Sequence, residues 1–313
     1  MTTATRIRPA RRATRPASAW VTHRKGEVEV LQAAALKRLP WLVHGFSTRT
    51  GGTSILNGHS ALNLGFTKWD TRTRVRANRQ KLLAALDGEE MALVTLKQIH
   101  SDFVHRVPFA PGQALAFPSP VFTATGDALL TRKKGLLLAV QTADCVPILL
   151  VDTTHRAVAA VHAGWRGTLK RIAAKTLGRM RMAFGTRPEQ VIAVLGPTIG
   201  RCCYEVGPEV ARAFASQFAR ATDWFDPFET EEEPNPLQWL SMMPPGHPPP
   251  PKKSQLDLIT ANAWQLTDAG VPASSVIASP LCTACRRDLF FSYRREGAGT
   301  GRLMAVIGIR ETR

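Results

Sequence analysis

The chain has 313 residues, of which 44% are hydrophobic and 21% charged, the composition of a globular protein with one large or two small domains. Its formal net charge is +17 at pH 7. No stretch approaches the roughly 18 consecutive apolar residues of a membrane-spanning helix. The arginine-containing N-terminus has no apolar block of the signal-peptide kind, so we expect a cytoplasmic protein. Five cysteines, an odd number, argue against a disulfide framework.

The basic charge is concentrated first at the N-terminus. Residues 1–25 hold six arginines, one lysine and no acid, and we predict a disordered basic arm there, followed by a single domain over 26–313. The other basic residues are spread along the chain, without zinc-finger spacing or a basic stripe interleaved with aromatics, which does not favour nucleic-acid binding. Residues 229–254 are acidic, then proline-rich, then basic, and are predicted to be a surface insertion.

Strand-like and helix-like segments alternate irregularly along the chain. Strands are predicted where short apolar runs end in glycine or charged residues, and helices where apolar residues recur every three or four positions. The expected strands are 94–99, 136–141, 146–151, 157–161, 191–196 and 303–309, and the expected helices are 167–184, 208–219 and 256–270. This order lacks a strict βαβ rhythm and favours an α+β fold with mixed sheets. No dinucleotide-binding or P-loop glycine motif is present.

A thiol and an imidazole stand at the ends of two neighbouring predicted strands. Asp144 and Cys145 interrupt the apolar run LLLAVQTADCVPILLV, and His162 ends the run AVAAVHAG. If 146–151 and 157–161 form a hairpin, Cys145 and His162 lie at the same open end of it. His100 in LKQIHSD also follows a strand-like run, and it is a third candidate.

Two chemical roles fit His100, Cys145 and His162. One thiolate and two imidazoles can hold zinc, or copper, with a fourth position left open for water. The alternative is a Cys145 nucleophile with His162 or His100 as its base. A buried cysteine can also be a simple apolar filler. The neighbouring polar residues argue against filler, because burying them without partners would be costly; they are Gln98, Gln141, Asp144 and Arg166.

One further polar stretch and the four remaining cysteines stand out in the sequence. The segment GFSTRTGGTS contains Ser47, Arg49 and a Gly-Gly turn, which together suit an anion. The other cysteines form an adjacent pair, Cys202 and Cys203, and a C-x-x-C at Cys282 and Cys285. Without a second C-x-x-C, this spacing does not indicate a zinc site, and we predict structural thiols.

The motifs, taken together and in order, resemble the bacterial multicopper polyphenol oxidase or laccase-domain family. They are FSTRTGG, ALNLG, QIH, QTADCVPILL, AVHAGWRGT, IGRCCYEVG, LDL-x-x-AN and LCTAC…FFSYRREG…TGR, and they span roughly residues 40–310. The resemblance implies a four-layer α/β/β/α sandwich and a zinc site made by His100, Cys145 and His162. It also implies that Ser47, Arg49 and Asn63 line the same pocket. Thr198 stands where the family often has a cysteine.

The resemblance also sets the functional expectation. It implies a metal-dependent purine nucleoside phosphorylase, acting on purine nucleosides and phosphate, with adenosine deaminase and methylthioadenosine phosphorylase side activities. The alternatives are a copper-dependent polyphenol oxidase and a cysteine hydrolase that edits peptidoglycan precursors. Eight mostly scattered histidines cannot supply the four copper ions of a true laccase. We expect a monomer or a weak homodimer, with Zn²⁺ as the metal and Cu²⁺ as the other candidate.

Overall fold

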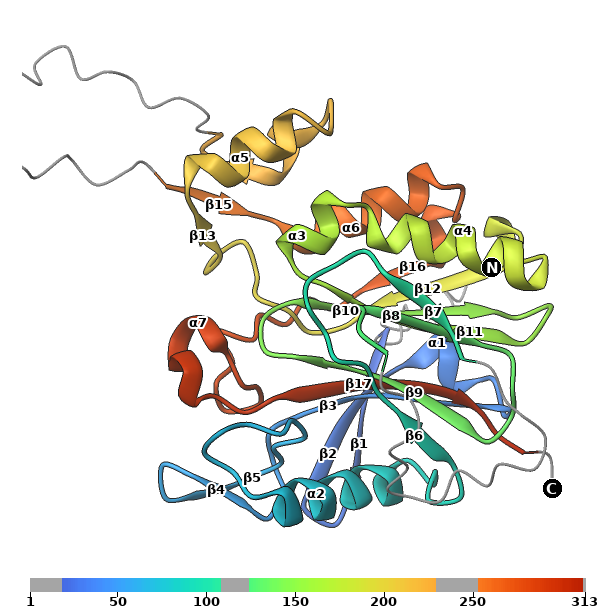
Figure 1. Cartoon of the computed structure of the whole chain (residues 1–313), viewed down its shortest axis with the longest axis vertical. Helices are drawn as coiled ribbons and strands as arrows, with labels where there is room; N and C mark the ends of the chain where they lie inside the picture. The colour runs from blue at the N-terminus through green and yellow to red at the C-terminus, as the bar shows by residue number, and fades with distance from the viewer. Residues whose placement is uncertain (1–18, 108–123, 229–252, 312–313) are drawn as a thin grey trace, which may run out of the picture.

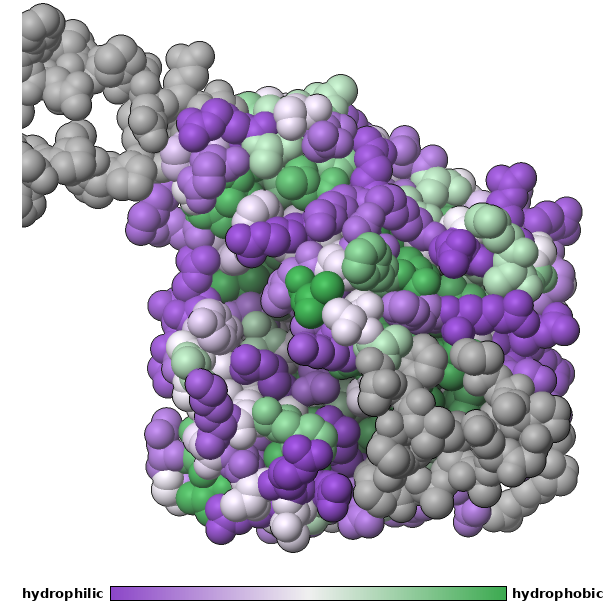
Figure 2. Space-filling model, in the orientation of Figure 1, coloured by the Kyte–Doolittle hydropathy of each residue, from purple (hydrophilic) through white to green (hydrophobic). Residues whose placement is uncertain are grey.

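The computed structural model describes residues 19–107, 124–228 and 253–311 (Figure 1). Most of the predicted arm, residues 1–18, and most of the predicted insertion, residues 229–252, lie outside the described residues. No helix within the described ranges is both long and apolar enough to cross a membrane. Hydrophilic residues cover most of the face shown in Figure 2, and the apolar groups on it are small.

Two six-stranded sheets form the centre of the domain, and both contain parallel and antiparallel pairs, as predicted for mixed sheets. The first has the order β1 (Trp20–Lys25), β2 (Val28–Ala33), β3 (Leu42–Ser47), β17 (Leu303–Ile309), β9 (Leu136–Thr142) and β6 (Ala92–Val94). The second has the order β16 (Val276–Ala278), β12 (Val191–Leu195), β10 (Val146–Asp152), β11 (Ala157–Ala163), β8 (Ala128–Thr131) and β7 (Val104–Arg106).

The remaining elements cover these sheets or extend from them. The helices are α1 (Ala34–Lys37), α2 (Arg72–Ala85), α3 (Trp165–Leu169), α4 (Ile172–Phe184), α5 (Pro208–Ala215), α6 (Leu258–Asp268) and α7 (Tyr293–Glu296). Short 3-10 helices span Pro188–Gln190, Ala221–Trp224, Ala273–Ser275 and Gly297–Gly299. A small sheet joins β13 (Glu205–Val206), β15 (Ser254–Leu256) and β14 (Phe225–Asp226), and β4 (Ser54–Leu56) pairs with β5 (His59–Ala61).

Three apolar cores separate four layers, which confirms the expected α/β/β/α sandwich. One core lies between α2 and the first sheet, one between the two sheets, and one between the second sheet and α4 and α6 (Figure 1). Strand β9 shows why its sequence is continuously apolar. Leu138 and Val140 belong to the core between the sheets, and Leu137 and Ala139 to the core beneath α2. A strand buried on both faces needs apolar residues at every position.

The folded domain begins earlier than predicted, because Trp20–Lys25 of the expected arm forms β1. This strand pairs with β2 through a tight turn, with Lys25 opposite Val28. The Trp20 ring packs edge-on against Phe46 at 5.5 Å between centroids. The net basic charge of the segment led to the prediction of a disordered arm, although its apolar residues, Trp20 among them, pack against the domain.

The predicted helix over 167–184 is also wrong as a single helix. The chain forms α3 and α4, and Arg171 between them has a left-handed φ of 60°. Asn262 and Gln265 of α6 donate to the hydroxyl and the carbonyl of Thr168, at 2.9 and 2.7 Å. These tertiary hydrogen bonds hold the end of α3, and helical periodicity cannot reveal them. The predicted strand 94–99 is wrong, because β6 ends at Val94, where that strand was expected to begin. The predicted helix 208–219 is shorter than expected and ends at Ala215.

A buried histidine in β3 makes the stability of this fold depend on pH. His44 is 2% exposed, and its Nε2 accepts a hydrogen bond from the backbone N–H of Ala33 at 3.1 Å. Burial lowers the pKa of His44 from 6.5 to about 4. The unfolded chain therefore binds a proton between these pH values that the folded protein does not. Stability contributed by the neutral ring is complete above the unfolded pKa and is lost as the pH falls toward 4, by up to roughly 3 kcal/mol.

The substitution His44→Gln tests this dependence, since a glutamine oxygen can still accept from Ala33 and does not titrate. We expect the free energy of unfolding of His44→Gln to fall less steeply than that of the wild type between pH 6.5 and 4. Urea unfolding at a series of pH values measures it, with His59→Gln at an exposed histidine as the control. Parallel curves for wild type and His44→Gln would contradict the assignment.

Candidate functional site

Three candidate residues predicted from the sequence meet at one end of the second sheet. The β10–β11 hairpin forms as predicted, with Val146 opposite Ala163 and Pro147 opposite His162. Cys145 precedes this pairing, and His100 reaches it from the loop after β6. The Cys145 Sγ lies 3.9 Å from His100 Nε2, and the two imidazole centroids are 4.9 Å apart. One ligand atom from each of the three residues lies within 4.8 Å of the others.

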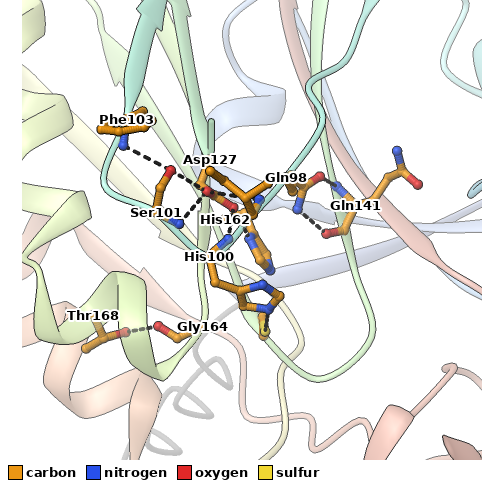
Figure 3. A network of polar contacts seen from close by, with 11 residues as sticks. Gln98, His100, Ser101, Phe103, Asp127, Gln141, His162, Gly164 and Thr168 are labelled. Atoms are coloured by element: carbon orange, nitrogen blue, oxygen red, sulfur yellow. Dashed lines mark hydrogen bonds and ion pairs between the residues drawn. The ribbon is translucent and has the colours of Figure 1, made fainter. Parts of the chain in front are cut away.

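A buried carboxylate, Asp127, positions both histidines (Figure 3). Its Oδ1 is 2.8 Å from His162 Nδ1 and accepts from the backbone N–H of His100 at 3.1 Å. Its Oδ2 accepts from the N–H of Ile99 and from both the N–H and the hydroxyl of Ser101. His100 has a left-handed φ of 59°, which is uncommon for a residue other than glycine. The hydrogen bonds from three consecutive backbone N–H groups offset the cost of that conformation.

The absence of a side chain at Gly164 gives the cluster its space. A Cβ at this position would lie 2.9 Å from Cys145 Sγ and 3.0 Å from His100 Cδ2. Gly164 has an ordinary φ of −75°, so the backbone conformation does not require glycine there. Glycine is required because the side chains of Cys145 and His100 approach this position too closely for a Cβ.

The electrostatics of the cluster favour a thiolate beside an imidazolium when no metal is bound. Burial by itself would raise the pKa of the Cys145 thiol, but the charge of His162 and contacts with both histidines lower it to about 6. Burial would lower the pKa of His162, but the charge of Cys145 and the bond to Asp127 raise it to about 9. Burial opposes ionisation of Asp127 too, yet the bonds from His162 and Ser101 hold its pKa at about 2.

The donor set fits a zinc ion or another soft divalent ion. Asp127 engages Nδ1 of His162, which leaves Nε2 as the donor atom on the side of Cys145. A thiolate and two imidazole nitrogens make the three-residue ligand set of an open zinc site. His100, Cys145 and His162 are the residues that would hold it.

Two other predicted residues frame the cluster. Gln98 exchanges two hydrogen bonds with the backbone of Gln141, both at 2.7 Å, and so joins the loop of His100 to the end of β9 (Figure 3). Arg166 is exposed in the first turn of α3, and its guanidinium lies 4.3 Å from the centroid of the Trp165 ring. It follows Gly164 by two residues, and its charge acts on Tyr204, as the charge of Cys145 does.

Asp144, next to Cys145, gathers three distant loops. Its carboxylate accepts from the Thr283 hydroxyl and from the Arg294 N–H, both at 2.6 Å. Its carbonyl accepts from the Ile199 N–H and from the Thr198 hydroxyl. Asp144 is 7% exposed and has a left-handed φ of 91°. These four bonds fix the backbone that presents the thiol.

The guanidinium of Arg49 contacts other residues of the protein. Its Nη1 pairs with Glu296 at 2.8 Å and donates to the carbonyls of Arg287 and Phe290. Its guanidinium also lies over the Phe291 ring, 4.6 Å from the centroid. The carboxylate of Glu296 therefore already balances the positive charge that the sequence suggested for binding an anion.

Ser47 and Asn63 are also occupied inside the fold. The Ser47 oxygen accepts from the N–H of Met304 at 2.9 Å. Asn63 is fully buried, donates to Asp70 at 2.8 Å and accepts from the N–H of Arg302 at 2.9 Å. Both join segments that lie far apart in the sequence.

Three features of the structure were not recognised in the sequence. Asp127 has no local motif, because its partners lie 27 and 35 residues away. Burial raises the pKa of Tyr204, and the charges of Cys145, Arg294, Asp144 and Arg166 also act on it, so this ring lies within electrostatic reach of the site. The third is that Cys202, Cys203, Cys282 and Cys285, whose spacing argued against a shared site, have sulfurs within 4.8 Å of one another.

Asp127→Asn tests whether this carboxylate sets the metal affinity. Loss of the oriented Nδ1 bond should weaken zinc binding by about 10- to 100-fold, measured by competition with a chromophoric chelator. The matched control is Asp152→Asn, because Asp152 is also fully buried and pairs with a histidine Nδ1, that of His155, at 2.9 Å, but at the hairpin turn. We expect it to keep wild-type zinc affinity. Equal affinities for all three proteins would remove the role of Asp127.

Known proteins resemble the whole folded region. The chain is 35% identical over 266 residues to a purine nucleoside phosphorylase of Bacteroides thetaiotaomicron, covering 85% of this chain and 91% of that protein. It is also 35% identical to the adenosine deaminase RL5 of an unknown prokaryotic organism, covering 85% and 93%. The crystal structure of YlmD from Geobacillus stearothermophilus superimposes with a TM-score of 0.73 at 32% identity, over 93% of this chain and 100% of that one.

The family resemblance noted in the sequence is confirmed by a direct match. The family described as multi-copper polyphenol oxidoreductase laccase matches residues 43–310, which include all three residues of the cluster. This protein belongs to that family.

Proposed function

We propose that this protein catalyses the phosphorolysis of purine nucleosides at the His100, Cys145 and His162 cluster. The observation that carries the proposal is the coincidence of two facts. A relative with 35% identity over most of both chains is named a purine nucleoside phosphorylase. The matched region brings two histidines and a thiol of lowered pKa together around one buried carboxylate.

The reaction sets two requirements for the residues around the cluster. A phosphate oxygen forms a bond to C1′ of the ribose while the bond from C1′ to the purine nitrogen breaks, and the purine leaves with the electron pair and takes a proton. The chain must orient the phosphate anion and must hold the nucleoside with its C1′ facing that anion. A zinc ion held by the three residues would supply Lewis-acid polarisation of a substrate atom.

Arg166 is the side chain we assign to phosphate. It is exposed, its charge and that of Cys145 both act on Tyr204, and a guanidinium binds phosphate through paired N–H groups. Arg49, Ser47 and Asn63, which the motifs suggested for the substrate pocket, have intramolecular partners; we assign them to holding the walls of the pocket. Burial lowers the pKa of Arg302, against the opposing charges of Tyr293, Cys145 and Asp144, so this guanidinium lies within electrostatic reach of the cluster.

Adenosine deamination is a second candidate, favoured by the relative named adenosine deaminase RL5. In that reaction water replaces the amino group at C6 of the purine, giving inosine and ammonia. It needs no phosphate, so the two activities separate experimentally. Methylthioadenosine would undergo the same bond exchange at C1′ as inosine.

Product analysis tests the proposal directly. Purified protein is incubated with inosine, adenosine or methylthioadenosine, with and without phosphate, and the products are separated by chromatography. We expect free base and the sugar 1-phosphate only when phosphate is present, and inosine from adenosine in its absence. Cys145→Ser should abolish both reactions. Turnover of phenols with bound copper, or cleavage of a muramyl peptide without nucleoside turnover, would instead support one of the two alternatives.

Arg166→Ala tests the phosphate assignment. Loss of a charge-assisted contact should lower kcat/KM for phosphate by about 10- to 100-fold and leave deamination nearly unchanged. Arg181→Ala, which removes an exposed arginine near the end of α4, should change neither reaction. If Arg49→Ala raised KM for phosphate and Arg166→Ala did not, the phosphate contact would belong to Arg49.

A further inference from the structure

A second cluster of cysteines lies apart from the His100, Cys145 and His162 site. Cys202 and Cys203 follow β12, and Cys282 and Cys285 follow β16. The Cys285 sulfur is 3.6 Å from that of Cys202 and 3.4 Å from that of Cys203. We propose that these four cysteines bind a structural zinc ion as a tetrathiolate site, independent of the catalytic function proposed above.

The sulfur positions suit a tetrahedral ion. With zinc-to-sulfur bonds of roughly 2.3 Å, the edges of a tetrahedron of sulfurs measure about 3.8 Å. The separations of 3.6 and 3.4 Å from Cys285 to Cys202 and Cys203 are close to this edge, and all four sulfurs lie within 4.8 Å of one another. Four ligands from the chain leave no open position, as is typical of structural zinc sites.

Donors around the sulfurs complement the charge of such a site. The backbone N–H of Gly200 donates to Cys282 Sγ at 3.1 Å, and an Nη2 N–H of Arg295 donates to Cys203 Sγ at 3.3 Å. Four thiolates around a divalent ion carry a net charge of −2, which N–H donors and a guanidinium stabilise. A Cβ at Gly200 would lie 3.3 Å from Cys202 Sγ, so glycine allows this loop to approach closely.

The ion would fasten together the two loops that support the backbone beside Cys145. Thr198, just before the first cysteine pair, forms a parallel bridge with Cys282, and Thr283 donates its N–H to the Thr198 carbonyl. Both threonine hydroxyls then donate to Asp144. The cysteine cluster is therefore linked through Thr198 and Thr283 to Asp144, the residue before Cys145. This link gives the proposed ion a structural role.

The experiment uses the full chain in a Cys145→Ser background, because that change removes the thiolate of the first site and keeps the other four cysteines. We expect about one equivalent of zinc to remain by elemental analysis. Replacement by Co²⁺ should give the intense sulfur-to-cobalt charge-transfer and visible bands of tetrahedral thiolate coordination. Adding Cys202→Ser and Cys285→Ser should abolish both signals and lower Tm by several degrees.

Three outcomes would overturn the proposal. The first is a Cys145→Ser protein that retains no zinc when purified under reducing conditions and supplied with Zn²⁺. The second is a cobalt spectrum without sulfur charge-transfer bands. The third is a disulfide from Cys285 to Cys202 or Cys203, found by alkylation and peptide mapping in protein kept under those conditions. The first two measurements need only the Cys145→Ser protein, so failure of the triple variant to fold would not obscure the result.

Discussion

The site depends on the burial of one carboxylate. Asp127 is fully buried, and a buried charge is tolerated only when its oxygens are satisfied. It collects the backbone N–H groups of 99–101, the Ser101 hydroxyl and Nδ1 of His162. These bonds orient the imidazole of His162 and hold the backbone of His100. The same carboxylate therefore has all its oxygens satisfied and directs one donor atom of the cluster, while it places the loop that carries the other histidine.

A second buried acid performs the complementary task. Asp144 bonds to the segments around 198, 283 and 294 and holds the backbone before the thiol, whereas Asp127 orients the His162 imidazole and the backbone of His100. Asp144 lies just before β10 and Asp127 just before β8, and both strands contribute residues to two apolar cores. The rigidity of the site thus derives from the four-layer packing, and its chemistry derives from residues placed just beyond the ends of the strands.

Local patterns predicted the fold well where contacts are short in sequence. The β10–β11 hairpin needed only two apolar runs and a short polar turn, and its register then brought Cys145 toward His162. The break between α3 and α4, the role of Asp127 and the pairing of Cys202 with Cys285 depend on contacts across 94, 35 and 83 residues. Spacing along the chain carries no information about such contacts. For the same reason the motifs drew attention to Arg49 and Asn63, while their hydrogen-bond partners could be found only in the structure.

The arrangement also bears on the choice between a metal site and a thiol nucleophile. Cys145, His162 and Asp127 alone would make a plausible nucleophile, base and orienting acid, and the lowered pKa of Cys145 suits that role. A nucleophile needs one base, however, and here a second imidazole, His100, approaches the same sulfur at 3.9 Å. The fold holds His100 in a left-handed conformation with three hydrogen bonds to Asp127 from its own N–H and those of its neighbours. A third donor maintained at that conformational cost has no use in thiol catalysis and completes a ligand set, which favours the metal.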